Sequence, residues 1–407
     1  MSPVLPFEII ALIIDIVGEN EDKNLLKELA LVSHYFLQIC SKHLFATVEL
    51  HDAVPKRDIA SSKKGFVKLL KGSPDVVKYI RKLTYRVGLG INNDNHLLTP
   101  ILSYFLLTIP HLNCLKITTS GSVWRLDWKK LDSSLTSALL HLMHLPTINR
   151  IDLSYIEKFP LSSLFPCVNL LRLDLFHMVH IHENDDDSFE IVQSEVMPKL
   201  REFRTSGSSV LTRKLLHAKM QDGRPAFDPM NFRRLLLYDY FEDEWNIRYL
   251  LQNANLLEGL RLRNDLGQSI VGLHDILSPI ACTLKVLHLT IPCFSGAGSD
   301  LFSSAWRFCE ELEAMAGHNV LEALTFEIGV DGSESEDSIG NIIQKVGEVL
   351  VKSGWPALRQ VVFEVAYLRM DSAKLEALRS LISEKYLSHF SELESVAFNF
   401  SIDVFVM

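Results

Sequence analysis

A short pattern of apolar residues recurs along most of the chain. In each copy an apolar residue is followed by two variable residues, a second apolar residue, one variable residue and a third apolar residue. The alternation that ends each copy is typical of a β-strand with one buried face, and helical spacing fills segments between copies, such as 137–145, 246–254 and 340–354. The copies are IRKLTY (80–85), LNCLKI (112–117), INRIDL (148–153), LLRLDL (170–175), LREFRT (200–205), FRRLLL (232–237), LEGLRL (257–262), LKVLHL (284–289), LEALTF (321–326), LRQVVF (358–363) and LESVAF (393–398).

The copies predict a stack of strand–helix units. Their mean spacing is about 31 residues, and each unit has an apolar strand face that it cannot bury alone, so neighbouring units should stack with the fourth and sixth residues of each copy inside. This organisation resembles leucine-rich repeats, although the period is longer and only Asn264 lies near an asparagine-ladder position. We therefore expect an α/β fold whose main part is an irregular leucine-rich-repeat-like solenoid, or horseshoe. An ordinary α/β domain with a parallel sheet is the alternative.

The first fifty residues have a different pattern, that of three short helices. Pro6 suits the first turn of a helix that is apolar around nearly its whole circumference and is expected to end near Gly18. Asp22 has the position of an N-cap for a second helix over 23–33, and a third is expected over 34–43. Three short helices cannot bury such a first helix by themselves. It therefore either packs back onto the rest of the chain or is covered by a partner protein.

These residues resemble the F-box domain of fungal F-box proteins. The resemblance covers residues 4–50 and is carried by the Leu-Pro opening, the isoleucine-rich stretch LPFEIIALIIDIV (5–17) and the run LVSHYF (31–36). In that run Phe36 stands where many F-boxes have Trp, and His34 replaces the usual basic residue. The resemblance implies docking onto the Skp-type adaptor of a cullin–RING ubiquitin ligase. The expected adaptor contacts are Leu5, Pro6, Ile9, Ile10, Ile13, Val32 and Phe36.

A basic segment follows the helices. Lysine and arginine dominate residues 56–86, although the whole chain has a net charge of −9. These cations alternate with apolar residues and lack a pattern of interleaved aromatic residues. A helix over 66–72 that leads into a strand is therefore favoured over a nucleic-acid site. The expected domains are an F-box domain at 1–50, a helical bridge at 51–75 and a repeat solenoid at 76–407.

No motif for catalysis or for a cofactor is recognisable. The chain has neither a GxxxxGK[ST] phosphate loop nor a GxSxG nucleophile elbow. Its densest group of metal-type ligands is HMVHIHENDDD (177–187), which has no fixed ligand spacing and is interpreted as an acidic solvated loop. We therefore expect no catalytic residues, no metal, no cofactor and no enzymatic activity.

The composition limits where the protein acts. No run reaches the roughly 18 apolar residues that span a bilayer, and residues 9–17 lack the flanks of a signal peptide. The six cysteines are scattered and form no CxxC pair, which suits a reducing compartment. The sequence predicts a protein of the cytoplasm or nucleus that contacts neither a membrane nor a nucleic acid.

The strand face opposite the core is the candidate surface for a target protein. Alternation should expose four arginines and a tyrosine on three successive strands about 4.8 Å apart. Such a cluster indicates an acidic or phosphorylated segment on the target, unless acidic loops such as Asp185–Asp187 or Glu242–Glu244 neutralise it. The last strands should expose mostly uncharged residues. The expected target contacts are Arg204, Arg234, Tyr238, Arg261 and Arg263, and the preceding strands should expose the mixed charges of Lys116, Arg150, Asp152, Arg172 and Asp174.

The predicted function is that of a non-catalytic F-box substrate receptor in a Skp–cullin–F-box ubiquitin ligase, with an unknown target protein on the repeat region. Two alternatives stay open. One is an α/β hydrolase or transferase whose N-terminal helices form a dimerisation element, and the other is a repeat scaffold whose F-box no longer binds the adaptor.

Overall fold

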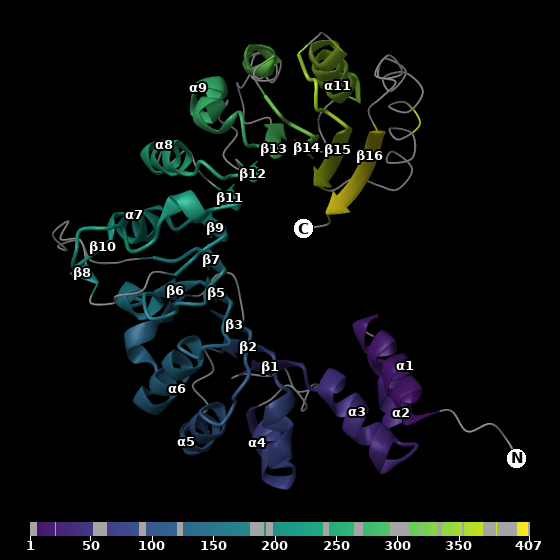
Figure 1. Ribbon diagram of the computed structural model, residues 1–407, viewed down its shortest axis with the longest axis vertical. Coiled ribbons are helices and arrows are strands. Elements are labelled where there is room, and N and C mark those ends of the chain that lie inside the picture. The colour runs from purple at the N-terminus through teal and green to yellow at the C-terminus, as the bar shows by residue number, and fades with distance from the viewer. Residues whose placement is uncertain are drawn as a thin grey trace, which may run out of the picture. The chain divides into compact units, whose positions relative to one another are not determined.

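In the computed structural model of the chain, strands whose side chains are alternately buried and exposed form parallel β-sheet (Figure 1). Two compact units are present, Met1–Lys199 with Lys214–Phe227 and Leu200–Arg213 with Asp228–Met407. Each is a mixed α/β unit in which helices connect parallel strands. The structure describes residues 6–20, 22–51, 63–88, 95–119, 125–179, 191–192, 198–238, 244–263, 272–293, 309–317, 319–331, 336–351, 354–368, 380 and 397–405.

The first unit begins with three helices and continues into a parallel sheet with the strand order β1-β2-β3-β5-β7. The helices of this sheet, α4 to α6, lie on one side of its strands (Figure 1). The helices are α1 (Phe7–Glu19), α2 (Lys23–Ala30), α3 (His34–Leu44), α4 (Lys63–Gly72), α5 (Asn95–Leu106) and α6 (Ser133–Met143), with 3₁₀ turns η1 (Pro74–Tyr79), η2 (Trp128–Lys130) and η3 (Leu161–Leu164). The strands are β1 (Thr47–His51), β2 (Lys82–Val87), β3 (Cys114–Thr119), β5 (Arg150–Ser154) and β7 (Arg172–Phe176), with the short pairs β4 (Leu126–Asp127) with β6 (Ile156–Glu157) and β8 (Ile191–Val192) with β10 (Lys219–Met220).

The second unit has the strand order β9-β11-β12-β13-β14-β15-β16, again parallel. Helices α8, α9 and α11 lie on one side of its strands (Figure 1). The strands are β9 (Glu202–Ser206), β11 (Arg234–Tyr238), β12 (Gly259–Arg263), β13 (Val286–Cys293), β14 (Ala323–Asp331), β15 (Gln360–Leu368) and β16 (Ala397–Phe405). The helices are α7 (Ser209–His217), which crosses the boundary between the units, α8 (Glu244–Asn253), α9 (Leu273–Leu277) and α11 (Glu336–Val351), with 3₁₀ turns η4 (Pro229–Asn231) and η6 (Ser278–Ile280).

The predicted strands and their inward faces are confirmed. Every copy of the sequence pattern overlaps a strand, and the fourth residues of neighbouring copies are paired in register within each unit. All of these paired side chains up to Val361 are at most 2% exposed. They are Leu83, Leu115, Ile151 and Leu173 in the first unit and Phe203, Leu235, Leu260, Leu287, Leu324 and Val361 in the second.

Two details of the strands differ from the prediction. The last copy is displaced, because Val361 pairs with Phe398 and not with the fourth residue of LESVAF. A shift by two residues keeps the same side chains on the same face. The sheet also contains β1, which was not predicted and which pairs Val48 with Leu83.

The helix boundaries also differ in two places. The second helix ends at Ala30, because Ser33 caps α3 by accepting a hydrogen bond from the Phe36 N–H (3.3 Å), and residues 31–33 form the turn. Helix α1 continues through Gly18 to Glu19. A Cβ at Gly18 would lie 2.3 Å from the His43 ring, so this glycine permits the close approach of α1 and α3. Among the described helices, none has the length and apolarity that a membrane crossing requires.

The stacked core gives a test with two leucines that are two residues apart. Leu173 is fully buried, whereas Leu171 is 39% exposed. We expect Leu173→Ala to lower the free energy of unfolding by about 2–5 kcal/mol because it opens a cavity in the core. Leu171→Ala should cost about 1 kcal/mol or less. Urea unfolding of both variants measures the difference, and equal losses would contradict the inward register.

Candidate functional sites on the helices and on the sheet face

The helices α1, α2 and α3, here called the helical trio, pack around a small core. Ile14, Leu26 and Cys40 supply one buried side chain from each helix. The predicted N-cap of α2 is confirmed, since the Asp22 carboxylate accepts a hydrogen bond from the Leu25 N–H (3.0 Å). The core is therefore limited to one apolar stripe of each helix.

Polar contacts fix how α1 lies on α3. Asp15 accepts hydrogen bonds from Lys42 Nζ (2.6 Å) and His43 Nε2 (2.7 Å), and these two contacts hold the pKa of its carboxyl below the usual value. At the other end of α1, the Tyr35 hydroxyl donates to the Phe7 carbonyl (3.0 Å). The orientation of α1 is thus set from both ends by its contacts with α3.

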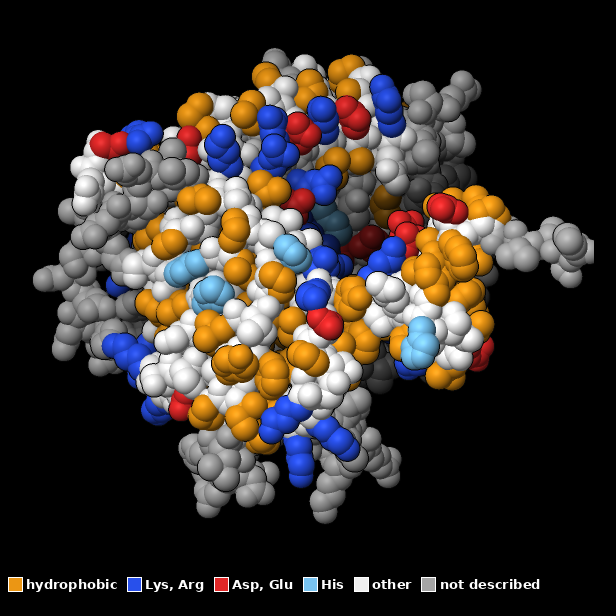
Figure 2. Space-filling view, turned by 60° about the horizontal axis from the view of Figure 1, so that its bottom comes forward, with side chains coloured by type: hydrophobic (Ala, Val, Ile, Leu, Met, Phe, Trp, Pro, Cys, Tyr) orange, Lys and Arg blue, Asp and Glu red, His pale blue; other side chains and the backbone are white. Residues whose placement is uncertain are grey.

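Much of the apolar surface of the trio faces outward. Phe7 is 63% exposed and Leu31, in the turn between α2 and α3, is 87% exposed. On the face of the molecule drawn in Figure 2, apolar side chains gather on the trio. An apolar area of this density on so short a segment is typical of a surface that another protein covers. The exposed large apolar residues of the trio are Phe7, Ile9, Leu12, Ile13, Ile16, Leu25, Leu31, Val32 and Leu37.

The residues expected to contact an adaptor fall into two groups. Pro6, Ile9, Ile13 and Val32 are exposed and available. Ile10 and Phe36 pack against the core of the trio and are only partly exposed, and Leu5 lies outside the described residues. Further exposed apolar residues of the trio were not among the expected adaptor contacts, although the circumferential apolar pattern of α1 and the leucines near α2 and α3 indicate them. They are Phe7, Leu12, Ile16, Leu25, Leu31 and Leu37.

The charged side chains on the strands of the first unit form ion pairs with one another. Asp152 and Asp174 are abreast on β5 and β7, and so are Arg150 and Arg172. Arg150 Nη2 reaches Asp174 Oδ2 at 3.0 Å, and Lys116 Nζ reaches Asp152 Oδ2 at 3.0 Å. The expectation that both aspartates are exposed is wrong, because these cations cover them and leave them 3% and 1% exposed.

The predicted arginine patch of the second unit is on one strand face, but it is paired with carboxylates. Arg234 and Arg204 lie 3.4 and 3.9 Å from Glu202. Arg261 and Arg263 lie 2.8 and 3.5 Å from Glu327, and the Arg263 guanidinium stands 5.7 Å over the Tyr238 ring. The loop 185–187 lies outside the described residues, as do 242–243. Within the described part of the chain, the acids that pair with this patch are the strand residues Glu202 and Glu327.

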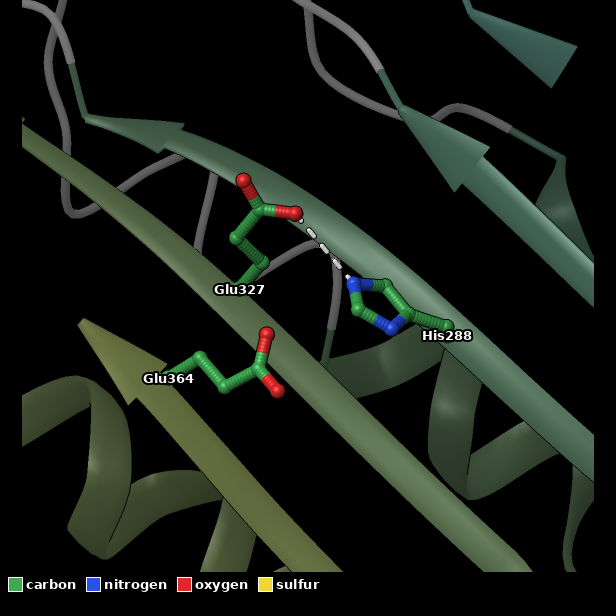
Figure 3. Close-up of side chains that lie close together, drawn as sticks. All are labelled: His288, Glu327 and Glu364. Carbon is green, nitrogen blue, oxygen red and sulfur yellow. Dashed lines mark hydrogen bonds and ion pairs between the residues drawn. The ribbon is translucent and has the colours of Figure 1, made fainter. Parts of the chain in front are cut away.

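The last strands carry charges that the sequence analysis did not place there. Glu327 of β14 and Glu364 of β15 are abreast in register, on strands expected to expose mostly uncharged residues. They were overlooked because the sequence pattern stops at its sixth residue, while β14 and β15 each extend over nine residues. The Nε2–H of His288 on β13 donates a hydrogen bond to the ionised Glu327 carboxylate at 3.2 Å (Figure 3).

Of the histidine-rich run 177–187, only His177 to Val179 are described. His177 stacks on Tyr155 with ring centroids 4.9 Å apart. His180, His182 and the acidic residues after them lie outside the described residues. The only group of metal-type ligands that meets within the described residues is His288, Glu327 and Glu364.

The sequence matches no known protein-family model and no curated protein.

The lowered pKa of the Glu327 carboxyl makes the stability of the fold depend on pH. Burial alone raises its pKa, but hydrogen bonds from His288 and Arg261 and the charges of Arg263 and Arg261 outweigh burial and lower the pKa to about 2. A carboxyl with a lowered pKa stabilises the fold above its unfolded pKa and loses that contribution as the pH falls toward 2. A lowering from 4.5 to about 2 corresponds to about 3 kcal/mol as an upper bound.

We therefore expect Glu327→Gln to be less stable than the unmodified chain at pH 7, by an amount that shrinks as the pH falls from about 4.5 toward 2. Urea unfolding of both proteins at a series of pH values measures this difference. A difference that stays constant down to the acid limit of folding would show that the ionised carboxylate is not the stabilising form.

Proposed function

We propose that the chain is the substrate-recognition subunit of a Skp–cullin–F-box ubiquitin ligase. The helical trio binds the Skp-type adaptor, and the strand region binds a target protein. The observation that carries this proposal is the apolar patch of the trio, which the trio's own core does not use. The resemblance of residues 4–50 to fungal F-box domains supports a Skp-type adaptor as the partner.

The free energy of burying apolar side chains favours binding of a partner to the trio. Burying one large apolar side chain contributes about 1.5–3 kcal/mol relative to leaving it in water. Covering several of the nine exposed side chains of the trio would therefore favour association, against the entropic cost that any complex must overcome. Because Asp15 and Tyr35 already hold α1 on α3, the surface is pre-organised and little of that free energy is lost in ordering it.

The strand region supports a leucine-rich-repeat-like solenoid as the target-binding part. In each unit the strands are parallel and the helices lie on one side of them (Figure 1). The strands also carry paired charged side chains, such as Arg150 with Asp174 and Arg261 with Glu327. A strand face without covering helices is the broad surface that repeat proteins use for recognition. We propose that the target binds on this face of the second unit.

Adaptor binding is tested on exposed isoleucines of α1. Ile9→Ala with Ile13→Ala removes apolar surface without touching the buried Ile14. We expect the affinity for a purified Skp-type adaptor to fall by about ten- to a hundredfold, since each 1.4 kcal/mol is tenfold. Isothermal titration measures the change.

The matched control is Leu107→Ala. Leu107 and Ile13 are both 47% exposed, but Leu107 follows α5 and lies outside the trio. Its replacement should leave adaptor affinity unchanged. Absence of adaptor binding by the unmodified, folded chain would instead favour a repeat scaffold whose F-box has lost its partner.

Target binding is tested at Arg234, the most accessible of the predicted arginines. Its side chain is 68% exposed and its ion pair with Glu202 is open to solvent, so an acidic or phosphorylated group of a target can replace Glu202 at little cost. Arg234→Glu should reduce target co-purification severalfold and leave adaptor affinity intact. Quantitative mass spectrometry of co-purified proteins measures the effect.

Arg233→Glu is the control for this charge reversal. Arg233 precedes β11 and pairs with Glu258, away from the arginine patch. Both variants change the net charge equally, so equal losses of the same proteins would mean that overall charge, and not the strand face, governs capture.

A further inference from the structure

Three neighbouring strands of the second unit bring an imidazole and two carboxylates together. His288 projects from β13, Glu327 from β14 and Glu364 from β15 (Figure 3). One ligand atom of each residue lies within 4.8 Å of those of the other two. Glu327 is buried, while His288 and Glu364 are partly buried, so the group is sheltered but reachable from the charged face.

The two carboxylates, Glu327 and Glu364, differ in how far neighbouring groups compensate their negative charge. Like charges directly abreast on adjacent strands destabilise a sheet, and Glu327 and Glu364 are register partners. Glu327 is compensated by Arg261, Arg263, His288 and Thr290. No hydrogen bond or ion pair from any other described residue reaches Glu364. A cation next to Glu364 would remove the repulsion between the two carboxylates.

We propose that His288, Glu327 and Glu364 bind a divalent transition-metal ion of the zinc type. Imidazole nitrogen and carboxylate oxygen are both ligands that Zn²⁺ accepts, and a site with three protein ligands leaves the fourth tetrahedral position open. The distance from His288 Nε2 to Glu327 Oε2 is 3.2 Å. Ligands at about 2.0–2.1 Å from a tetrahedral ion are separated by about 3.3 Å, so these two atoms already have the required spacing. Glu364 reaches the ion by a side-chain rotation.

The surrounding groups have defined roles in this site. Arg261 Nη2 and Thr290 Oγ1 donate to the same Glu327 oxygen, at 2.8 and 3.1 Å, and orient the carboxylate as outer partners of metal ligands do. Their hydrogen bonds must lengthen when that oxygen takes the ion. The His288 ring must carry its proton on Nδ1 when Nε2 binds the metal. The two arginine charges oppose a dication, so the affinity is lower than that of a thiolate site.

The donor set excludes a calcium-type site. Ca²⁺ takes about six to eight oxygen ligands, whereas this group offers two carboxylates and a nitrogen. Mg²⁺ and Ca²⁺ are therefore suitable negative probes. Since the site is on the strand face, it is independent of adaptor docking by the helical trio, and neither proposal rests on the other.

The test is a Zn²⁺ titration of the full chain after treatment with a chelator. Calorimetry gives the affinity, and elemental analysis after gel filtration gives the stoichiometry. We expect Glu364→Gln and His288→Gln, which nearly preserve side-chain size, to lose one ion per chain or to bind it about tenfold or more weakly. The same amounts of Mg²⁺ or Ca²⁺ should not replace Zn²⁺.

Two controls separate this ion from other zinc bound by the chain. Glu202→Gln removes an arginine-paired carboxylate of the same face and should leave zinc binding unchanged. His180→Ala with His182→Ala removes the histidines of the 177–187 run and should leave the ion at His288 in place. Far-UV circular dichroism of the metal-free variants checks that they are folded. Failure of the unmodified chain to bind Zn²⁺, or full retention of the ion in both His288→Gln and Glu364→Gln, would overturn the proposal, whatever the adaptor titration shows.

Discussion

The hydrogen-bond register between parallel strands is the constraint on which the rest of the structure depends. Because neighbouring copies pair at equal positions, Leu83 lies beside Leu115 and Leu260 beside Leu287. Within each unit this alignment buries the fourth and sixth residues of the copies up to LRQVVF in a largely apolar layer. A slip by one residue would turn this layer outward on every affected strand, so the repeated apolar spacing and the register enforce one another.

The same alignment creates the electrostatic problem of the opposite face. Equal positions often carry equal charges, as with Arg150 beside Arg172 and Asp152 beside Asp174. Within the first unit the rows of opposite sign are offset by two residues, so each arginine side chain can lean toward an aspartate. Among the described residues, the cations beside this pair contact Glu327 and not Glu364. The proposed cation site rests on that difference.

The sequence predicted the strands and their inward residues, which are periodic. It did not predict the ion pairs, which depend on the conformations of long side chains. The strands and inward residues followed from alternation, because burial of one strand face leaves that signal directly. β1 was detectable too, since FATVEL (45–50) has the same pattern as the other copies, with Val48 as its fourth residue. It was overlooked because the segment was assigned wholly to the N-terminal helices.

Other features could not be derived from spacing. The covering of Asp152 by Lys116 and the pairing of Arg261 with Glu327 depend on rotamers of long side chains. The carboxylate that neutralises Arg261 comes from a strand two copies further along the chain. Gly18 was expected to end α1, but its role is steric, and only the position of His43 reveals it.

In the helical trio, the residues that fix the orientation of α1 differ from the apolar residues that α1 exposes. Asp15 with its two partners, Gly18 under His43 and Tyr35 at Phe7 fix α1 on α3 through polar and steric contacts. The small core needs only Ile14 and the residues beside it from α1. The outward isoleucines, leucine and phenylalanine therefore contribute little to holding the trio together. A surface residue that is not required for folding can be polar at no cost to the fold, so the apolar character of all of these positions is the physical support for the proposed docking surface.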